Sequence, residues 1–492
     1  MVIPSALMNR KHEELLDEIA RQAMIEKGLD PDFNKDVRKQ LEGIRAPARR
    51  DESVRDLRGW GWCSIDNDDS RDLDQLTWAE DALDGNVRIF IAVADVDALV
   101  KKNTPIDRHA RHNTTSVYTA ATLFPMLPEK LSTDLTSLNE GEDRVALVIE
   151  VTVRDDGHIV SEDVYPGLVH NHAKLAYDRV AAWLDGEDDE PEKVRHFEGL
   201  AESLRMQDRT ADRMRDLRHE QGALDLETIE AKPIIRDGQV VELRQARRNN
   251  ARLLIEDFMI AANGVTARFL ARHKLPSIRR VVRSPERWDR IERIAEELGE
   301  RLPPEPDAIA LEEFLKRRKK ADPMRFPDLS LSIVKAMGAG EYVLEEAGEK
   351  PTGHFGLAVK DYTHSTAPNR RYPDLITHRL VKAALAGEKS PYSVDELEEL
   401  AEHCTKQEDA ANKVERHVRK AAAAYMLADR VGQTFDGIVT GASSKGTWVR
   451  IFNPPIEGKV VRGWEGLDIG DRTRVKLLGV DVERGFIDFG KR

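Results

Sequence analysis

The stretch GWGWCSIDNDDSRDLDQ, residues 59–75, contains a short apolar segment that is followed at once by a cluster of aspartates. The carboxylates are Asp66, Asp68, Asp69, Asp72 and Asp74, and Arg71 is the one cation among them. Two carboxylates about 5 Å apart repel each other by roughly 3 kcal/mol at an effective dielectric constant near 20. The loop must therefore be open to water or hold a compensating cation.

Apolar runs of strand length surround this acidic loop. The segments 59–65, 87–96 (VRIFIAVADV) and 144–153 (RVALVIEVTV) are bounded by Asp, Gly or Asn, which predicts a sheet. A loop between buried strands favours a hard, oxygen-seeking divalent ion over full exposure. Calcium fits the spacing less well, because Arg71 stands where an EF-hand needs glycine and Thr77 where it needs glutamate. A solvated loop, a magnesium site and a calcium site all remain open at this stage.

The rest of the chain mixes helices and strands, which predicts the α+β class. Residues 254–273, 288–299 and 394–430 have helical patterns, and residues 8–45 carry helical periodicity that breaks near 28–31. The polar segment 46–58 is typical of a linker. Beyond residue 432, short strands alternate with Gly, Asn and Pro turns, which predicts a small β-barrel. We predict three domains: a helical module at 1–50, a central domain of helices and strands at 51–431 and a barrel at 432–492.

The predicted barrel differs in charge from the whole chain. Ten Lys or Arg against eight Asp or Glu follow residue 432, a net charge of +2 in a chain whose formal net charge is −13. Aromatic residues are interleaved with these cations: Phe435, Trp448, Phe452 and Trp464. Cations and stacking rings together favour a surface that binds single-stranded nucleic acid. The alternative is that the aromatic side chains form the barrel core.

Composition excludes several classes of protein. The two cysteines, Cys63 and Cys404, exclude a disulfide framework and a CxxC zinc site. No run of about 20 apolar residues is present, and the first residues lack the pattern of a cleaved signal. We therefore expect a cytoplasmic protein with no membrane partner and no disulfide-linked partner. We also expect a monomer.

Several sequence motifs resemble those of a known family and occur in the same order along the chain. They are the acidic loop, SVYTAATLFPMLPEKLSTDLTSLNEGEDR (116–144), KLAYDRV (174–180), GALDLETIEA (222–231), ARLLIEDFMIAAN (251–263) and HFGLAVKDYTHSTAPNRRYPDLITHRLV (354–381). Together they resemble the ribonuclease II/R (RNB) family. The C-terminal segment similarly resembles an S1 RNA-binding domain, an OB-type barrel.

The resemblance implies a processive 3′-to-5′ exoribonuclease that hydrolyses single-stranded RNA and releases nucleoside 5′-monophosphates. It implies that two Mg²⁺ ions are bound during catalysis and that Mn²⁺ can replace them. The residues that would bind these ions are Asp66, Asp72, Asp74 and Gln75. Arg370 matches the family's catalytic arginine, and Asp74 is the second residue to which we assign a catalytic role. A guanidinium suits the negative charge that builds on phosphoryl oxygens.

The resemblance also implies nucleotide contacts. Tyr118 and Tyr177 match aromatic positions near the 3′-terminal nucleotides. Glu256 matches a glutamate that reads the 2′-hydroxyl together with the second tyrosine, which is how a protein distinguishes RNA from DNA. Glu415 matches a further nucleotide-contacting glutamate. Each has a plainer alternative, because a tyrosine at a helix start is usually core and a helical glutamate usually faces water.

Three departures from the family pattern matter. Gln75 replaces the last carboxylate of the family's DxDD signature, which should weaken metal binding. Leu226 stands where an aromatic residue usually completes the clamp on the terminal bases, and leucine lacks a π face. About 50 helical residues cannot contain the family's two cold-shock barrels. We interpret them as a helix-turn-helix-like module that leaves a less enclosed entrance for structured RNA, or alternatively as an oligomerisation helix pair.

Two rival functions follow from the same residues. One is a catalytically silent RNA-binding protein that keeps the channel and the S1 barrel but has lost turnover through Gln75. The other is an endonuclease or DNase, which Tyr177 and Glu256 argue against.

Overall fold

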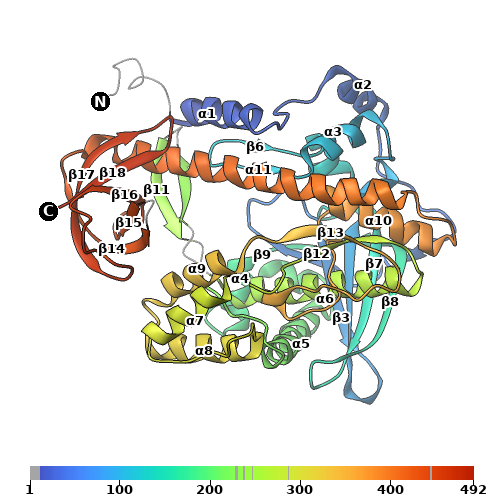
Figure 1. Cartoon of the computed structure of the whole chain (residues 1–492). Coiled ribbons are helices and arrows are strands. Elements are labelled where there is room, and N and C mark those ends of the chain that lie inside the picture. The colour runs from blue at the N-terminus through green and yellow to red at the C-terminus, as the bar shows by residue number, and fades with distance from the viewer. Residues whose placement is uncertain (1–11, 228–230, 237–238, 246–247, 286, 444–445) are drawn as a thin grey trace.

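The structure is a computed structural model that describes residues 12–227, 231–236, 239–245, 248–285, 287–443 and 446–492. Its centre is a seven-stranded sheet (Figure 1). In spatial order the strands are β1 (Arg55–Asp56), β8 (Ile159–His170), β7 (Asp143–Val153), β4 (Val87–Ala94), β3 (Gln75–Asp81), β2 (Cys63–Asp66) and β9 (Ala173–Ala176). The outer pairs β1–β8 and β2–β9 are parallel, and the inner neighbours are antiparallel.

Both faces of this sheet are buried. Successive residues of a strand point to opposite faces. In β4, Ile89, Ile91 and Val93 join the main apolar core, whereas Phe90 and Ala92 join a second core on the other face. This explains why the sequence of β4 is a continuous apolar run and not an alternating one.

Between residues 35 and 427, helices contribute to the main apolar core on one face of this sheet. They are α2 (Lys35–Gly43), α3 (Pro105–Asn113), α4 (Tyr177–Leu184), α5 (Leu200–Glu220), α6 (Asn250–Arg272), α10 (Tyr372–Leu385) and α11 (Val394–Leu427). A further group, α7 (Trp288–Glu297), α8 (Ala308–Ala321) and α9 (Phe326–Met337), packs around its own apolar core. Short two-stranded sheets complete the region: β5 (Val117–Tyr118) with β6 (Leu123–Phe124), β10 (Ala231–Arg236) with β11 (Gln239–Gln245), and β12 (Ser277–Val281) with β13 (Glu341–Glu345).

The C-terminal part is a closed five-stranded barrel (Figure 1). Its strands are β14 (Thr434–Ser443), β15 (Gly446–Ile451), β16 (Glu457–Arg462), β17 (Arg472–Asp481) and β18 (Phe486–Lys491). β14 pairs with both β15 and β17, which closes the ring. The predictions of an α+β fold and of a C-terminal OB-type barrel are therefore confirmed.

The N-terminal region is helical, as predicted. α1 (His12–Glu26) lies alongside α11 (Figure 1), while α2 packs against α3. α1 and α2 thus have their main contacts with different helices. The helix-turn-helix interpretation of residues 1–50 and the domain boundaries stay predictions, and residues 1–11 lie outside the described part of the chain.

In the described part of the chain, no helix combines the length and the apolarity that crossing a bilayer requires.

The two cysteines give a simple test of this packing. Cys63 lies in β2 and Cys404 in α11, and both side chains are buried. Burial raises the pKa of Cys63 to about 12 and also raises that of Cys404, so neither thiol ionises near neutral pH. We expect a disulfide-exchange reagent such as DTNB to titrate no thiol in the native protein and two in guanidinium chloride. Rapid native labelling of either cysteine would contradict the packing of that element.

Candidate active site

The centre of the site is an ion pair between Asp74 and Arg370, residues 296 positions apart in the sequence. Asp74 stands immediately before β3 and its side chain is buried. The Nε of Arg370 donates to Asp74 Oδ2 at 2.9 Å, and the backbone N–H of Asn369 donates to Oδ1 at 3.3 Å. Both oxygens of this carboxylate are therefore held by one segment, 369–370.

That segment is fixed by the start of α10. The fully buried Asp374 accepts the backbone N–H of Ala367 at 2.8 Å and pairs with Arg371 at 2.7 Å. On the other side, the carbonyl of Arg370 accepts the N–H of Ser116 at 2.9 Å. The loop is thus anchored at both ends, and 42% of the Arg370 side chain remains accessible.

Asp74 is electrostatically unusual. Its burial is the largest influence and raises its pKa to about 6, against an ordinary value of 3.8, and the nearby Asp72 adds to this, while Arg370 acts in the opposite direction. One guanidinium therefore does not fully compensate the buried carboxylate. A site of this kind attracts additional positive charge.

Two other aspartates of the loop, Asp66 and Asp72, accept hydrogen bonds from hydroxyl groups. Asp66, the last residue of β2, accepts the Ser70 hydroxyl at 2.8 Å and the backbone N–H of Asn67 at 2.6 Å. Asp72 accepts the Tyr118 hydroxyl at 2.9 Å. The Nζ of Lys174 donates to the carbonyls of Asp68 and Ser70, which folds the loop back on β9. The loop is thus neither an EF-hand nor fully solvated.

The donor chemistry suits Mg²⁺, although the carboxylates do not form a ready cage. Among the described residues, no three His, Cys, Asp or Glu side chains gather closely enough to hold a metal by themselves. Mg²⁺ commonly keeps several waters and uses one or two carboxylates together with substrate phosphates. Gln75, the first residue of β3, is almost buried and lies next to Asp74 in the chain. Three carboxylates, one amide and an undercompensated buried charge fit an ion that is completed by substrate.

Tyr118 and Glu415 are brought together as well. Tyr118 lies on the short strand β5, and its backbone N–H donates to Glu415 Oε1 of α11 at 2.8 Å. Its hydroxyl reaches Asp72, so the ring lies beside the acidic loop. The side chain remains 44% exposed. An exposed ring held at both ends is suited to stacking on a base.

Tyr177 lies on the other side of the loop, at the start of α4. Asp66 of β2 pairs in register with Ala176, the residue before Tyr177. Burial raises the pKa of the Tyr177 phenol, and the nearby Asp66 adds to this. The guanidinium of Arg252 lies over this ring, 4.4 Å from its centroid, and donates to Asn67 Oδ1 at 2.7 Å. The sequence reasoning did not single out Arg252 or Asn67. Arg252 lies inside a motif used for the resemblance, four residues before Glu256, and this helical spacing was a signal that could have identified it.

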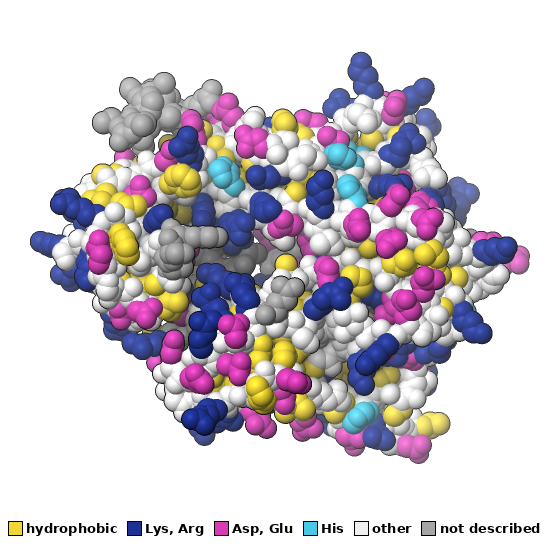
Figure 2. Space-filling model, viewed as in Figure 1, with side chains coloured by type: hydrophobic (Ala, Val, Ile, Leu, Met, Phe, Trp, Pro, Cys, Tyr) yellow, Lys and Arg dark blue, Asp and Glu magenta, His cyan; other side chains and the backbone are white. Residues whose placement is uncertain are grey.

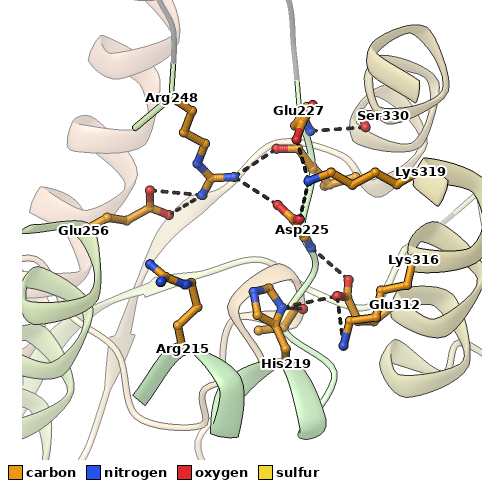
Figure 3. A network of polar contacts seen from close by, with 12 residues as sticks. Arg215, His219, Asp225, Glu227, Arg248, Glu256, Glu312, Lys316, Lys319 and Ser330 are labelled. Carbon is orange, nitrogen blue, oxygen red and sulfur yellow. Dashed lines mark hydrogen bonds and ion pairs between the residues drawn. The ribbon is translucent and has the colours of Figure 1, made fainter. Parts of the chain in front are cut away.

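Leu226 and Glu256 are joined through a polar network (Figure 3). Arg248 pairs with Glu256 at 3.1 Å and with Asp225 at 3.2 Å. Asp225 also accepts Lys319 of α8 at 2.8 Å, and its N–H donates to Glu312. The residue before Leu226 is thus fixed by α8. Leu226 itself packs partly against the core of α7–α9. Its side chain is therefore partly buried in the protein, which is consistent with an aliphatic residue at this position.

His219 lies at the edge of this network, and its ion pair predicts that the stability of the folded protein depends on pH. Its Nδ1 lies 3.2 Å from the buried Glu312, and this carboxylate raises the pKa of His219 above 6.5 (Figure 3). When the pKa of a histidine is higher in the folded state than in the unfolded state, its protonation stabilises the fold. This contribution is fully present below the unfolded-state pKa of about 6.5 and is lost as the pH rises through the folded-state pKa. We expect His219→Gln to lower the free energy of unfolding by about 2 kcal/mol at pH 6 and by much less at pH 9. Urea unfolding at both pH values measures this.

The control for that experiment is His196→Gln, which changes an exposed histidine. Its effect should be small at both pH values. A cost of His219→Gln that is equal at pH 6 and pH 9 would show that the ion pair does not depend on a protonated imidazole.

Trp448 lies in β15 and is partly buried. The Lys459 ammonium lies 5.8 Å from its ring. The barrel core is built mainly from Val449, Ile451, Val475, Leu477 and Phe489, with Phe435 packed against it. Phe452 and Trp464 are each 47% exposed. The aromatic residues of the barrel are therefore divided between its core and its surface. Figure 2 shows Lys and Arg side chains gathered beside the hollow between the barrel and α7–α9.

Comparisons with known proteins identify the family of this chain. The RNB domain model matches residues 54–387, and the model of the C-terminal S1 domain of RNase II-type exonucleases matches residues 433–491. The chain therefore belongs to the RNB family, as the motifs predicted.

Similar proteins include the Ribonuclease R of Escherichia coli K12, which is 32% identical over 92% of this chain and 59% of its own length. The Ribonuclease R of Aquifex aeolicus is 30% identical over 96% of this chain and 70% of its own length. The chain thus spans about 59% of the first relatives that it matches.

Solved structures share the fold. The Mycoplasma genitalium RNase R in complex with ribose-methylated single-stranded RNA superposes with a TM-score of 0.88 at 23% identity, over 98% of this chain and 78% of that one. Yeast Ssd1, described as a pseudonuclease, superposes with a TM-score of 0.70 at 18% identity, over 90% of this chain and 55% of that one. The same fold thus occurs in a nuclease and in a pseudonuclease, so activity must be argued from the site.

Proposed function

We propose that this protein is a magnesium-dependent 3′-to-5′ exoribonuclease that hydrolyses single-stranded RNA processively to nucleoside 5′-monophosphates. The observation that carries the proposal is the buried Asp74 carboxylate paired with the partly exposed side chain of Arg370, beside Asp72 and Tyr118. The membership in the RNB family and the Ribonuclease R relatives support it.

Each residue has a distinct proposed role. Asp66, Asp72, Asp74 and the amide oxygen of Gln75 would hold two Mg²⁺ ions, or Mn²⁺ in their place. Bound metal supplies charge stabilisation and a water of lowered pKa. Arg370 uses its Nε for Asp74, so its terminal nitrogens can face the phosphoryl oxygens on which charge builds. In the hydrolysis, water attacks the phosphorus and the 3′ oxygen of the preceding nucleotide leaves.

The nucleotide contacts complete the proposal. Tyr118 would stack on a terminal base and Leu226 would pack against one, while Tyr177 and Glu256 would read the 2′-hydroxyl. Glu415, which accepts the Tyr118 N–H, would contribute a further nucleotide contact. Trp448 would contact RNA on the barrel. We further propose that the protein acts as a cytoplasmic monomer and that it can degrade structured RNA.

The test uses a 5′-labelled single-stranded RNA of about 20 nucleotides. With Mg²⁺, we expect shortening from the 3′ end with mononucleotide release, and with chelator we expect none. A DNA of the same sequence should resist, because Tyr177 and Glu256 would lose their hydroxyl partner.

Binding without metal-dependent shortening would favour a catalytically silent RNA-binding protein, and internal cuts or equal attack on DNA would favour an endonuclease or DNase. A duplex with a short 3′ tail tests the structured-RNA part, which stalling well before the duplex would contradict.

A further inference from the structure

The nucleotide-contacting Tyr118 lies on a very small hairpin. β5 and β6 have two residues each, and the turn between them is closed by hydrogen bonds between Thr119 and Thr122. An isolated two-stranded hairpin is at best marginally stable in water. Besides the hydrogen bonds of Tyr118 to Glu415 and Asp72, the position of its ring therefore depends on what packs against this hairpin.

The hairpin has one buried and one exposed face. Val117 and its cross-strand partner Phe124 are buried, whereas Tyr118 and its partner Leu123 are 44% and 39% exposed. The buried pair belongs to an apolar cluster that is built mainly by α1 and α11. Leu16, Ala20 and Met24 of α1 are fully buried in this cluster. α1 and α11 thus support the back of the hairpin, and Tyr118 projects from its front.

Polar contacts fix the hairpin to α1 at its turn. The hydroxyl of Thr122 donates to Asp17 Oδ1, and the other oxygen of Asp17 accepts Nε of Arg21 at 3.1 Å. The guanidinium of Arg21 lies 5.6 Å from the centroid of the Phe124 ring. Asp17 and Arg21, one helical turn apart, therefore hold the turn and the second strand together.

We propose that α1 is a positioning element for Tyr118, acting through Asp17 and Arg21 on the β5–β6 hairpin. The inference rests on the proposed contact between Tyr118 and RNA. α1 does not touch RNA in this proposal, and it fixes the direction in which the tyrosine ring points. The helix at the N-terminal side of the chain thus takes part in the grip on the 3′-terminal nucleotides without lying in their path.

The experiment compares Thr122→Val, which removes only the hydroxyl donor, and Asp17→Ala, which removes both polar contacts. The matched control is Gln22→Ala on the same helix, whose side chain is exposed and bonds to Glu26. The readouts are the Kd for single-stranded RNA by fluorescence anisotropy in chelator, and kcat and KM with Mg²⁺. Thermal melting followed by circular dichroism confirms that each variant is folded.

The decisive measurement is a double-mutant cycle with Tyr118→Ala. We expect Thr122→Val and Asp17→Ala to raise Kd and KM about fivefold, with kcat within about twofold, because a lost hydrogen bond is worth roughly 1 kcal/mol. In the Tyr118→Ala background the same substitutions should change Kd by less than about twofold. Gln22→Ala should leave the Kd for RNA unchanged in either background.

Two results would overturn the inference. One is an equal loss of affinity with and without Tyr118, because α1 would then act elsewhere. The other is no loss in either background while Tyr118→Ala itself weakens binding. Failure of the proposed function looks different: the wild-type protein would not shorten RNA with Mg²⁺, although the binding cycle in chelator could still be measured.

Discussion

Replacing Asp74 with asparagine is expected to lower kcat for RNA hydrolysis by at least about a thousandfold, while the Kd for RNA in chelator stays within about threefold. The amide keeps the size of the side chain and loses the charge that a metal and Arg370 require. Because the carboxylate is buried and held by Nε of Arg370 and the N–H of Asn369, no neighbouring side chain can take its exact place. Single-turnover kinetics with saturating enzyme measures the chemical step.

The matched control is Asp81→Asn. Asp81 is exposed at the far end of the same strand β3, so this substitution changes the net charge equally at a distance from the site. Its kcat should equal that of the wild-type protein. If Asp74→Asn keeps more than a tenth of the activity, Asp74 does not belong to the metal site.

Replacing Arg370 with methionine should also remove most of the activity, by about 10²- to 10⁴-fold in kcat with a smaller change in KM. The guanidinium is proposed to act where charge builds on the phosphoryl oxygens, so its loss affects the transition state more than the bound substrate. Arg370→Lys should recover only a small part, because an ammonium lacks the two-pronged geometry and cannot both bind Asp74 and face two oxygens.

Two further variants distinguish a specific loss of catalysis from a general effect of removing an arginine. Arg154→Met alters an exposed arginine in the turn between β7 and β8 and should leave kcat unchanged. The double variant of Asp74 and Arg370 should be little worse than the poorer single variant, since the two side chains act as a unit. Fully multiplicative losses would argue against that coupling.

The sequence predicted the framework of the fold well because its signals were local. The apolar runs at 87–96 and 144–153 became β4 and β7, and the helical patterns at 254–273 and 394–430 became α6 and α11. The break near residues 28–31 separates α1 from α2 as predicted. Periodicity and turn residues are properties of neighbouring positions, so they can be recognised without a structure.

The site was predicted less completely because its contacts are long-range. The pairing of Asp74 with Arg370 joins segments that no spacing rule connects, and only the resemblance to a family placed both in one centre. Arg252 on the Tyr177 ring and Arg248 beside Glu256 were missed. The helical spacing of Arg252 from Glu256 was the available signal, but spacing alone does not show which ring an arginine side chain covers. Charge counting also treated the five aspartates alike, whereas burial makes Asp74 different from its neighbours.

The position of α1 against α11 has a consequence for how the chain matures. α1 is near the beginning of the chain, and most of the surface that buries it, Ala410 to Ala422 of α11, is near the end. During synthesis, α1 leaves the ribosome long before that surface exists. Contacts between such distant segments form late, because the entropy of closing the intervening loop must be overcome first. The Tyr118 hairpin can therefore be completed only after α11 has been made, so that a partly synthesised chain lacks the structure on which the proposed contact between Tyr118 and RNA depends.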